Sequence, residues 1–424
     1  MNIFSRNVLK LGGGTALGQM LAVLATPIIT RLYSPADMGL LGIFMAFVGF
    51  TSVGVSLRYE MPLVSVRDHS EAGCLLTTSL FLTVPISLLA GLILYAMIDR
   101  NLLTYNLLPA WSPLVAVFML ALIGIFSTLR YWAVRQGRYD VVGRALVSQG
   151  MGRAVVPIGM SLLHVGWIGL LVGEIASRIF GIERMMRIAW PAIIDSLRPF
   201  RLGYFVLILR RHWKSPAILL PSSLVDALAA TIPLPLISHL FGPGPAGQFF
   251  LVQRLSSLPA SLIASSVADV FHPAIADAHW NDSGNIREIL LKVTKKLAIA
   301  SVIIYIPTAI ISPFAFGLIF GEEWYETGLC MAIISPLSMV SLVVSPVSRL
   351  LLVVDKMEVK FIFDFVGLVL PISGLFLGNY FGFSFLTCLM VYVFFHILAN
   401  ILYYYLIWRA SNPFTAQAAV NGIL

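Results

Sequence analysis

Residues 27–35 read PIITRLYSP and are followed by Gly39, and residues 235–243 read PLISHLFGP and are followed by Gly247. The second copy lies 208 residues after the first, close to half of the 424-residue chain. Each copy ends an apolar stretch, turns at a proline and enters another apolar stretch. Two apolar halves with one pattern are typical of transporters, in which two helical bundles rock about a central site.

The composition indicates a membrane protein. Apolar residues make up 58% of the chain and charged residues 11%, and the mean hydropathy is +0.90. A soluble domain carries about 25% charged residues, so most of this surface must face lipid. The net charge of +8 would suggest nucleic acid in a soluble protein. Here we assign it to cytoplasmic loops and anionic lipid headgroups.

The apolar stretches predict the membrane topology, because a helix needs about 20 apolar residues to span a bilayer. We expect an all-α integral membrane protein with about twelve spans. They cover residues 9–30, 38–57, 73–98, 112–132, 143–163, 166–183, 216–240, 246–271, 297–320, 327–352, 360–379 and 384–408. The spans form two six-helix lobes, 1–183 and 216–424. A cytoplasmic linker, 184–215, joins them as an amphipathic segment on the membrane surface.

Basic residues are divided unevenly between the two sets of loops. With both termini cytoplasmic, 23 of the 28 Lys and Arg residues fall in cytoplasmic loops, and the outer loops hold Arg31 and Arg100. The other three, Arg153, Arg178 and Arg254, fall inside predicted spans. Because basic residues are retained on the cytoplasmic side, this distribution supports both the orientation and the number of spans.

Sequence motifs for catalysis are missing. Gly12-Gly13-Gly14-Thr15 has no following lysine and so is not a phosphate-binding loop. We interpret these glycines as positions of close helix packing. Cys74, Cys330 and Cys388 lie in apolar segments and are expected to be buried apolar residues. We expect no enzyme and no cofactor, and transport driven by the substrate's own gradient or by coupling to H⁺ or Na⁺.

Charged residues inside the predicted spans are the candidate functional residues, because an ionisable group at that depth is costly unless it is paired or hydrated. They are Arg153, Glu174, Arg178, Asp226, Arg254, Asp269 and Asp364. The arginines suit a phosphate, since a guanidinium binds oxyanions through two parallel hydrogen bonds. Glu174 and Arg178 are one helical turn apart and can pair with each other. The four acids are candidates for ion coupling, and each could equally pair with an arginine.

Several blocks of sequence together resemble a known family. In the first half they are the 27–35 copy with Gly39 and then residues 57–60, LRYE. In the second half they are residues 253–259 (QRLSSLP), 270–273 (VFHP), 320–324 (FGEEW) and 345–348 (SPVS). In this order the chain resembles the Wzx-type oligosaccharide flippases of O-antigen and exopolysaccharide biosynthesis. These belong to the polysaccharide transporter family of the multidrug/oligosaccharidyl-lipid/polysaccharide exporter (MATE/MOP) superfamily.

The resemblance implies a fold, a function and partners. Members have about twelve helices in two six-helix lobes that form a V around a cationic cavity. They move undecaprenyl-pyrophosphate-linked oligosaccharide across the bacterial inner membrane for lipopolysaccharide and other surface polysaccharides. Arg31, Arg58 and Arg254 fall in the matched blocks and are expected to bind the pyrophosphate, with Arg153 and Arg178 added by the charge argument. A polysaccharide polymerase and a chain-length regulator are the expected partners. His239 replaces Arg31 in the second copy, which argues against a symmetric role for Arg31.

Four other interpretations stay open at this point. A multidrug or cation antiporter of the same superfamily should have mainly acidic residues in its cavity, and three arginines against four acids do not decide this. A flippase for peptidoglycan precursors usually carries extra helices, for which this chain is short. A membrane polymerase or ligase would need a large outer loop, which the predicted spans do not leave. A structural scaffold would leave the buried arginines unexplained.

Overall fold

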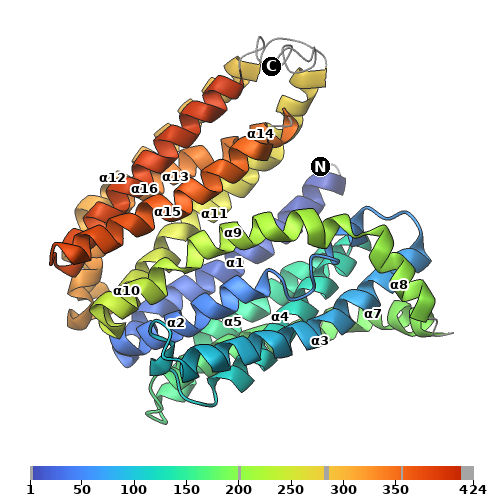
Figure 1. The fold of residues 1–424 in the computed structure, drawn as a ribbon, viewed down its shortest axis with the longest axis horizontal. Coiled ribbons are helices and arrows are strands. Elements are labelled where there is room, and N and C mark those ends of the chain that lie inside the picture. Colours follow the sequence, from blue (N-terminus) through green and yellow to red (C-terminus); the bar gives the residue numbers. More distant parts are fainter. Residues whose placement is uncertain (1–2, 199–201, 281–285, 355–356, 412–424) are drawn as a thin grey trace. The chain divides into compact units, whose positions relative to one another are not determined.

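The computed structural model describes residues 3–198, 202–280, 286–354 and 357–411, and these residues are helical or lie in connections, with no strand among them (Figure 1). The chain divides into two compact units, residues 1–247 and 248–424. Each unit is described by itself. The sequence instead predicts two lobes, each of six membrane spans, joined by a linker at 184–215. That division stays a prediction.

The first unit contains ten α-helices and the start of an eleventh. They are α1 (Ile3–Leu32), α2 (Pro35–Ser52), η1 (Met61–Val64), α3 (His69–Asp99), η2 (Tyr105–Leu107), α4 (Ser112–Arg135), α5 (Tyr139–Ser161), α6 (Trp167–Ile179), α7 (Ile182–Leu197), α8 (Leu202–Arg211), η3 (Ser215–Leu219), α9 (Leu220–Thr231), α10 (Pro233–Phe241) and α11 (Pro243–Trp280). The closest helix pairs are α1 with α5, α5 with α6, and α3 with α4.

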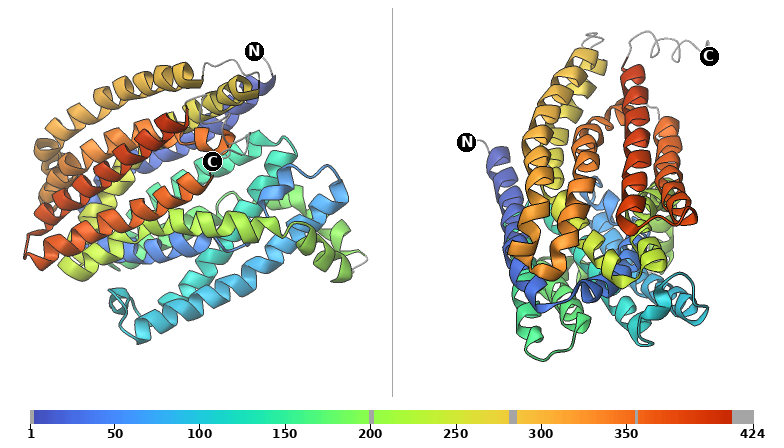
Figure 2. Two further views of the ribbon diagram at one scale, coloured as in Figure 1. Left: turned by 45° about the horizontal axis from the view of Figure 1, so that its top comes forward. Right: turned by 90° about the vertical axis from the view of Figure 1, so that its left-hand side faces the viewer.

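The second unit continues α11 and adds α12 (Ile286–Phe320), η4 (Glu322–Trp324), α13 (Tyr325–Val347), α14 (Leu350–Val353), α15 (Met357–Tyr380) and α16 (Phe385–Ala410). Helix α12 packs along α13, and α16 packs along both α13 and α15 (Figure 2). The rings of Phe363 and Tyr403 stack between α15 and α16 with centroids 3.6 Å apart. These contacts make a helical bundle with its own apolar core around Leu290 and Val347.

Nine helical stretches of the described residues are long and apolar enough to cross a membrane. Apolar side chains also point outward: Leu114 is 75% exposed, and Phe314 and Leu318 are 79% exposed. Large apolar surfaces of this kind are typical of a protein that faces lipid. The other three predicted spans are also helical, as α5, α6 and the first part of α11. Helix α6 falls short of the criterion because it has only 13 residues.

The two copies of the repeated sequence fold alike and contact each other. In the first copy Ser34 caps α2 and Pro35 begins it. In the second copy α10 ends at Gly242, whose φ is 88°, and Pro243 begins α11. A Cβ on Gly39 would lie 1.9 Å from the Pro243 carbonyl oxygen, and a Cβ on Gly247 would lie 1.8 Å from the Pro35 carbonyl oxygen. The two helix starts therefore approach backbone to backbone, which only glycine permits at both positions.

Glycines also set the contact between α1 and α5. A Cβ on Gly14 would lie 2.5 Å from the Cα of Gly143, and a Cβ on Gly150 would lie 2.2 Å from the Gly18 carbonyl oxygen. Gly14 and Gly18 are four residues apart, the spacing that lets membrane helices pack closely. Of the glycines expected to pack a neighbouring helix, Gly14 does so, whereas Gly12 and Gly13 face open space.

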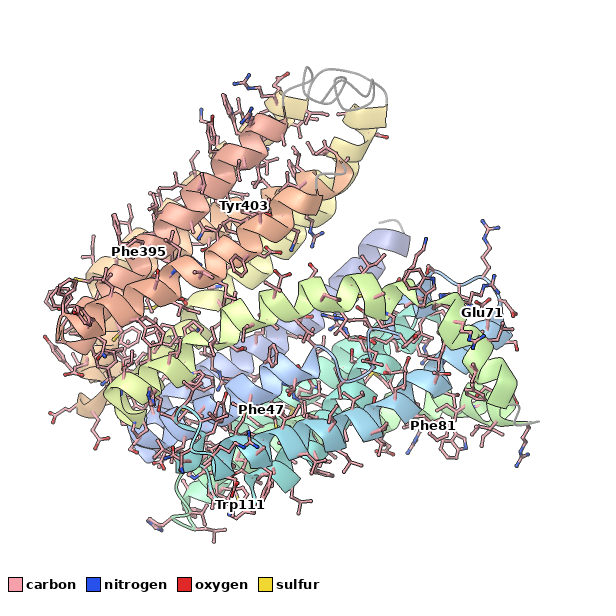
Figure 3. The ribbon with its side chains drawn as sticks, viewed as in Figure 1. Phe47, Glu71, Phe81, Trp111, Phe395 and Tyr403 are labelled. Carbon is pink, nitrogen blue, oxygen red and sulfur yellow. The ribbon has the colours of Figure 1, made fainter. Side chains whose placement is uncertain are left out.

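The segment predicted as a linker contains two amphipathic helices, α7 and α8, and their apolar faces pack on protein. Met185 and Ile193 of α7, with Phe205 of α8, are buried in one core with residues of α3 and α4. At the end of α8, His212 Nε2 lies 2.8 Å from a carboxylate oxygen of Glu71, and Arg211 pairs with the other oxygen at 3.1 Å. Figure 3 shows Glu71 at the end of α3 beside α8. The place of this segment relative to the bilayer stays a prediction.

Candidate functional site

Close packing of α5 against α6 positions the first group of charges. A Cβ on Gly152 of α5 would lie 2.9 Å from the Cα of Ser177, and a Cβ on Gly173 of α6 would lie 2.4 Å from a ring carbon of Pro157. Gly152 thus contacts the backbone of α6, and Gly173 contacts the ring of Pro157 on α5. Arg153 follows the first glycine and Glu174 follows the second, so the packing brings these two side chains together.

Arg153 and Glu174 form an ion pair between the two helices. Arg153 Nε donates to Glu174 Oε2 over 3.0 Å, and the side chains are 29% and 11% exposed. Arg178, one turn after Glu174, lies close enough to both residues to interact with their charges. Its Nε is buried and has no hydrogen-bond partner among the described residues. The group therefore holds two positive charges against one negative charge, with a donor available for an anion. We call Arg153, Glu174 and Arg178 the α5–α6 cluster.

Arg58 lies in a strained connection between α2 and η1. Leu57 and Arg58 have φ values of 51° and 63°, in the left-handed region that side chains other than glycine rarely adopt. The nearest guanidinium nitrogen of Arg58 is 4.0 Å from Glu60, whose other carboxylate oxygen accepts a hydrogen bond from Ser56. Arg58 Nε is buried without a hydrogen-bond partner among the described atoms. Strain of this kind is concentrated at functional sites.

The other predicted residues lie on other helices. Arg31 is exposed in the last turn of α1, and Asp226 is exposed on α9. Arg254 is half-buried on α11 in the second unit. Asp364 of α15 is nearly buried and accepts from Lys360 Nζ, 2.6 Å away and one turn earlier. The side chain of Asp269 lies outside the described residues.

Of the nine predicted site residues, the structure thus brings three together, in the α5–α6 cluster. The one-turn spacing predicts that Glu174 pairs with Arg178 on its own helix. In the structure its ion pair runs to Arg153 on α5, and the charge of Arg178 lies close to both. Sequence reasoning also missed Glu60 and Ser56 beside Arg58, although Glu60 lies in the LRYE block. Within the described part of the chain, no group of three or more His, Cys, Asp and Glu side chains is placed to hold a metal ion.

The folds of solved transporters match this chain along nearly its whole length. An inward-facing multidrug resistance MATE family transporter of the MOP superfamily superposes with a TM-score of 0.71 at 15% identity, covering 93% of this chain and 94% of that one. The lipid II flippase MurJ superposes with a TM-score of 0.67 at 14% identity, covering 92% and 86%. At such identities the likeness shows the fold alone. The chain is therefore a multi-pass membrane protein of the MATE-like fold, and the predicted fold class is confirmed.

Sequence similarity identifies the family to which the chain belongs. Residues 28–328 match the model of the polysaccharide biosynthesis protein family, and the chain belongs to that family. It is 28% identical over 176 residues to the teichuronic acid biosynthesis protein TuaB of Bacillus subtilis (strain 168), covering 42% of this chain and 36% of that protein. It is 22% identical over 324 residues to the succinoglycan biosynthesis transport protein ExoT of Rhizobium meliloti (strain 1021), covering 72% and 60%. The chain thus spans less than two thirds of either relative. The expected resemblance is confirmed at the level of the family.

Proposed function

We propose that this protein is a flippase for lipid-linked oligosaccharides used in polysaccharide biosynthesis, and not an enzyme. Membership of the polysaccharide biosynthesis protein family over residues 28–328 carries this proposal. The similarity to a succinoglycan transport protein supports the transport step. The MATE transporters share only the fold at about 15% identity, which does not favour drug export.

The proposed substrate is an oligosaccharide on undecaprenyl pyrophosphate. A pyrophosphate carries at least two negative charges, and the α5–α6 cluster offers two arginines against one carboxylate. Arginine suits this task because its charge persists on burial and its planar group matches two phosphate oxygens. Arg58, with a buried Nε that lacks a hydrogen-bond partner, is a second anion-binding position in the first unit. Arg31 and Arg254 are further proposed contacts on the strength of the family blocks.

The finer assignments belong to the same proposal. The protein resides in the bacterial inner membrane with both termini cytoplasmic and serves O-antigen or exopolysaccharide synthesis. A polymerase and a chain-length regulator act downstream. Glu174, Asp226, Asp269 and Asp364 are the candidates for H⁺ or Na⁺ coupling. Glu174 is paired with Arg153 and Asp364 with Lys360, so either carboxylate could couple to an ion only when its pair opens.

The test is to locate lipid-linked oligosaccharide in the two leaflets of a deletion strain. Units held in the cytoplasmic leaflet, and released by the wild-type gene, are the expected result. Arg58→Ala and Arg254→Ala proteins should accumulate but fail to release them. Units that reach the periplasmic leaflet without being polymerised would refute the flippase and support a polymerase. Unchanged glycolipids would instead support an antiporter.

A further inference from the structure

A short break separates α6 from α7, and an apolar groove lies beside this break. Helix α6 ends at Ile179 and α7 begins at Ile182. Between them Gly181 has a φ of 94°, and a Cβ on it would lie 2.6 Å from the Cβ of Ala145. Glycine is therefore required at this turn for both its conformation and its contact with α5.

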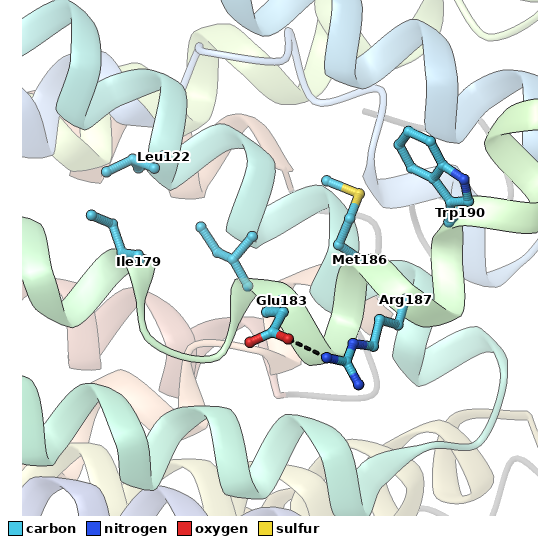
Figure 4. A pocket seen from close by; sticks show the side chains of 7 residues that line it. Leu122, Ile179, Glu183, Met186, Arg187 and Trp190 are labelled. Atoms are coloured by element: carbon cyan, nitrogen blue, oxygen red, sulfur yellow. Dashed lines mark hydrogen bonds and ion pairs between the residues drawn. The ribbon is translucent and has the colours of Figure 1, made fainter.

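The groove lies between this break and the middle of α4. It has a volume of about 410 Å³, within the range of small-molecule sites. Its lining residues are Leu122, Ile179, Ile182, Glu183, Met186, Arg187 and Trp190. Figure 4 shows Leu122 and Ile179 at one end and Trp190 at the other, with the Glu183–Arg187 ion pair along one side. Except for this pair, the lining is apolar or aromatic.

The groove is open at the surface of the first unit, beside a helix that is long and apolar enough to span the membrane. Ile179 is 46% exposed and Trp190 is 56% exposed, and α4 is a candidate membrane span. An apolar groove in this setting is filled by hydrocarbon, because water would gain no hydrogen-bond partners there. A peptide would leave its backbone groups unpaired on these walls, so the occupant is a lipid chain.

The charges around the groove select the headgroup. The first two turns of α7 carry exposed Arg184 and Arg187 against one carboxylate, Glu183. A positive excess at a membrane surface attracts anionic lipid. Trp190 has the amphipathic ring that is favoured at headgroup level. Hydrocarbon walls, a tryptophan and a net positive rim together match one anionic phospholipid molecule.

We propose that the groove between α4 and the α6–α7 break binds one acyl chain of an anionic glycerophospholipid, whose phosphate lies at Arg184 and Arg187. This lipid is held at the side of the first unit and is separate from the transported substrate. It fills the groove beside the helix break and supports α7 against α4. The inference stands on the groove and its charges, independently of the flippase function.

The first experiment uses the tryptophan as a reporter. Full-length protein is placed in nanodiscs that contain phosphatidylglycerol or phosphatidylcholine with dibrominated acyl chains. The emission of Trp190 is taken as wild type minus Trp190→Phe, because the chain has eight tryptophans. We expect stronger quenching by brominated phosphatidylglycerol than by brominated phosphatidylcholine. Equal quenching by the two lipids would overturn the proposed headgroup preference.

The second experiment fills the groove. Native mass spectrometry should detect phosphatidylglycerol on the detergent-purified protein, and Leu122→Phe should lower its retention about tenfold, the effect of displacing about two methylene groups. Leu114→Phe, on the lipid-exposed surface of the same helix, is the matched control and should retain it. Equal retention in both variants, or retention of a polyprenyl lipid in its place, would overturn the proposal. Arg187→Gln should lower the preference for phosphatidylglycerol over phosphatidylcholine, whereas Arg144→Gln, from the similar Arg144–Asp140 pair on α5, should not.

Discussion

Removing the carboxylate of the α5–α6 cluster is the sharpest test of how this site is built. In Glu174→Gln the side chain keeps its size, while Arg153 loses its ion-pair partner and faces the second positive charge of Arg178. We expect the protein to be less stable, because two like charges in a low-dielectric site are no longer compensated. In Arg153→Gln/Glu174→Gln one charge of each sign is lost, so the cluster returns to the wild-type excess of one positive charge and part of the stability should return.

The magnitude follows from the geometry. Two unit charges 3.0 Å apart attract by about 5–6 kcal/mol at an effective dielectric constant of about 20. Desolvation cancels part of this attraction, and breaking a buried pair costs about 3–5 kcal/mol. Arg153 is 29% exposed, so water compensates part of the loss. We expect about 2–3 kcal/mol for Glu174→Gln and a coupling energy of about 1–2 kcal/mol between the two positions.

The assay is unfolding of the purified protein in mixed micelles, measured for both single variants and the double variant. Asp140→Asn is the matched control: it breaks the exposed Arg144–Asp140 pair on α5 and should cost less than about 1 kcal/mol. If the two single effects simply add in the double variant, Arg153 and Glu174 do not act as a pair and the reasoning fails.

Three further outcomes follow from the contacts. Gly247→Ala places a Cβ against the Pro35 carbonyl and should lower the free energy of unfolding by about 2–3 kcal/mol, at the upper end for overpacking. Gly244→Ala, in open space on the same helix, is the control and should not lower the melting temperature. Equal melting temperatures of the two variants would contradict the close approach. Arg58→Gly relieves a left-handed residue but leaves the buried Glu60 carboxylate without its cationic neighbour, so the two effects oppose each other and stability should change by no more than about 1 kcal/mol. Surface polysaccharide should nevertheless disappear, and a normal polysaccharide level would exclude Arg58 from the site. Glu71→Gln removes the negative charge that faces Arg211 and His212 and should speed amide hydrogen exchange across α8, with Asp140→Asn as control. Unchanged exchange would show that apolar packing alone holds this helix.

The sequence predicts the fold well because burial in lipid leaves a direct mark on composition. Long apolar runs and the positions of prolines indicate the helices, and the repeat marks two equivalent turns. The break at Gly181 is less visible, because apolar residues continue through Ile179 and Phe180 and past the glycine to Ile182. The sequence indicates this break only through Gly181 and the charged residues at 178, 183 and 184. The predicted span 166–183 therefore includes the break.

The site was harder to predict, because its contacts run between helices. One-turn spacing made Arg178 the natural partner of Glu174, a rule that holds within one helix. The partner on α5 depends on how closely two helices approach, and glycine positions alone do not give the register between helices. Burial of particular atoms, such as Arg58 Nε, is likewise a property of the packed chain.

The contact between the repeated sequences has a further consequence. Pro35 contacts Gly247, and Pro243 contacts Gly39. The proline of each copy therefore contacts the glycine of the other copy. This reciprocity defines an isologous interface, the kind that joins two identical subunits about a two-fold axis. Here the two surfaces belong to one polypeptide, which is what fusion of the genes for a homodimer would produce. In a homodimer every substitution appears on both sides of such an interface. In the fused chain the copies can diverge separately, and His239 opposite Arg31 in the alignment of the repeats records that freedom.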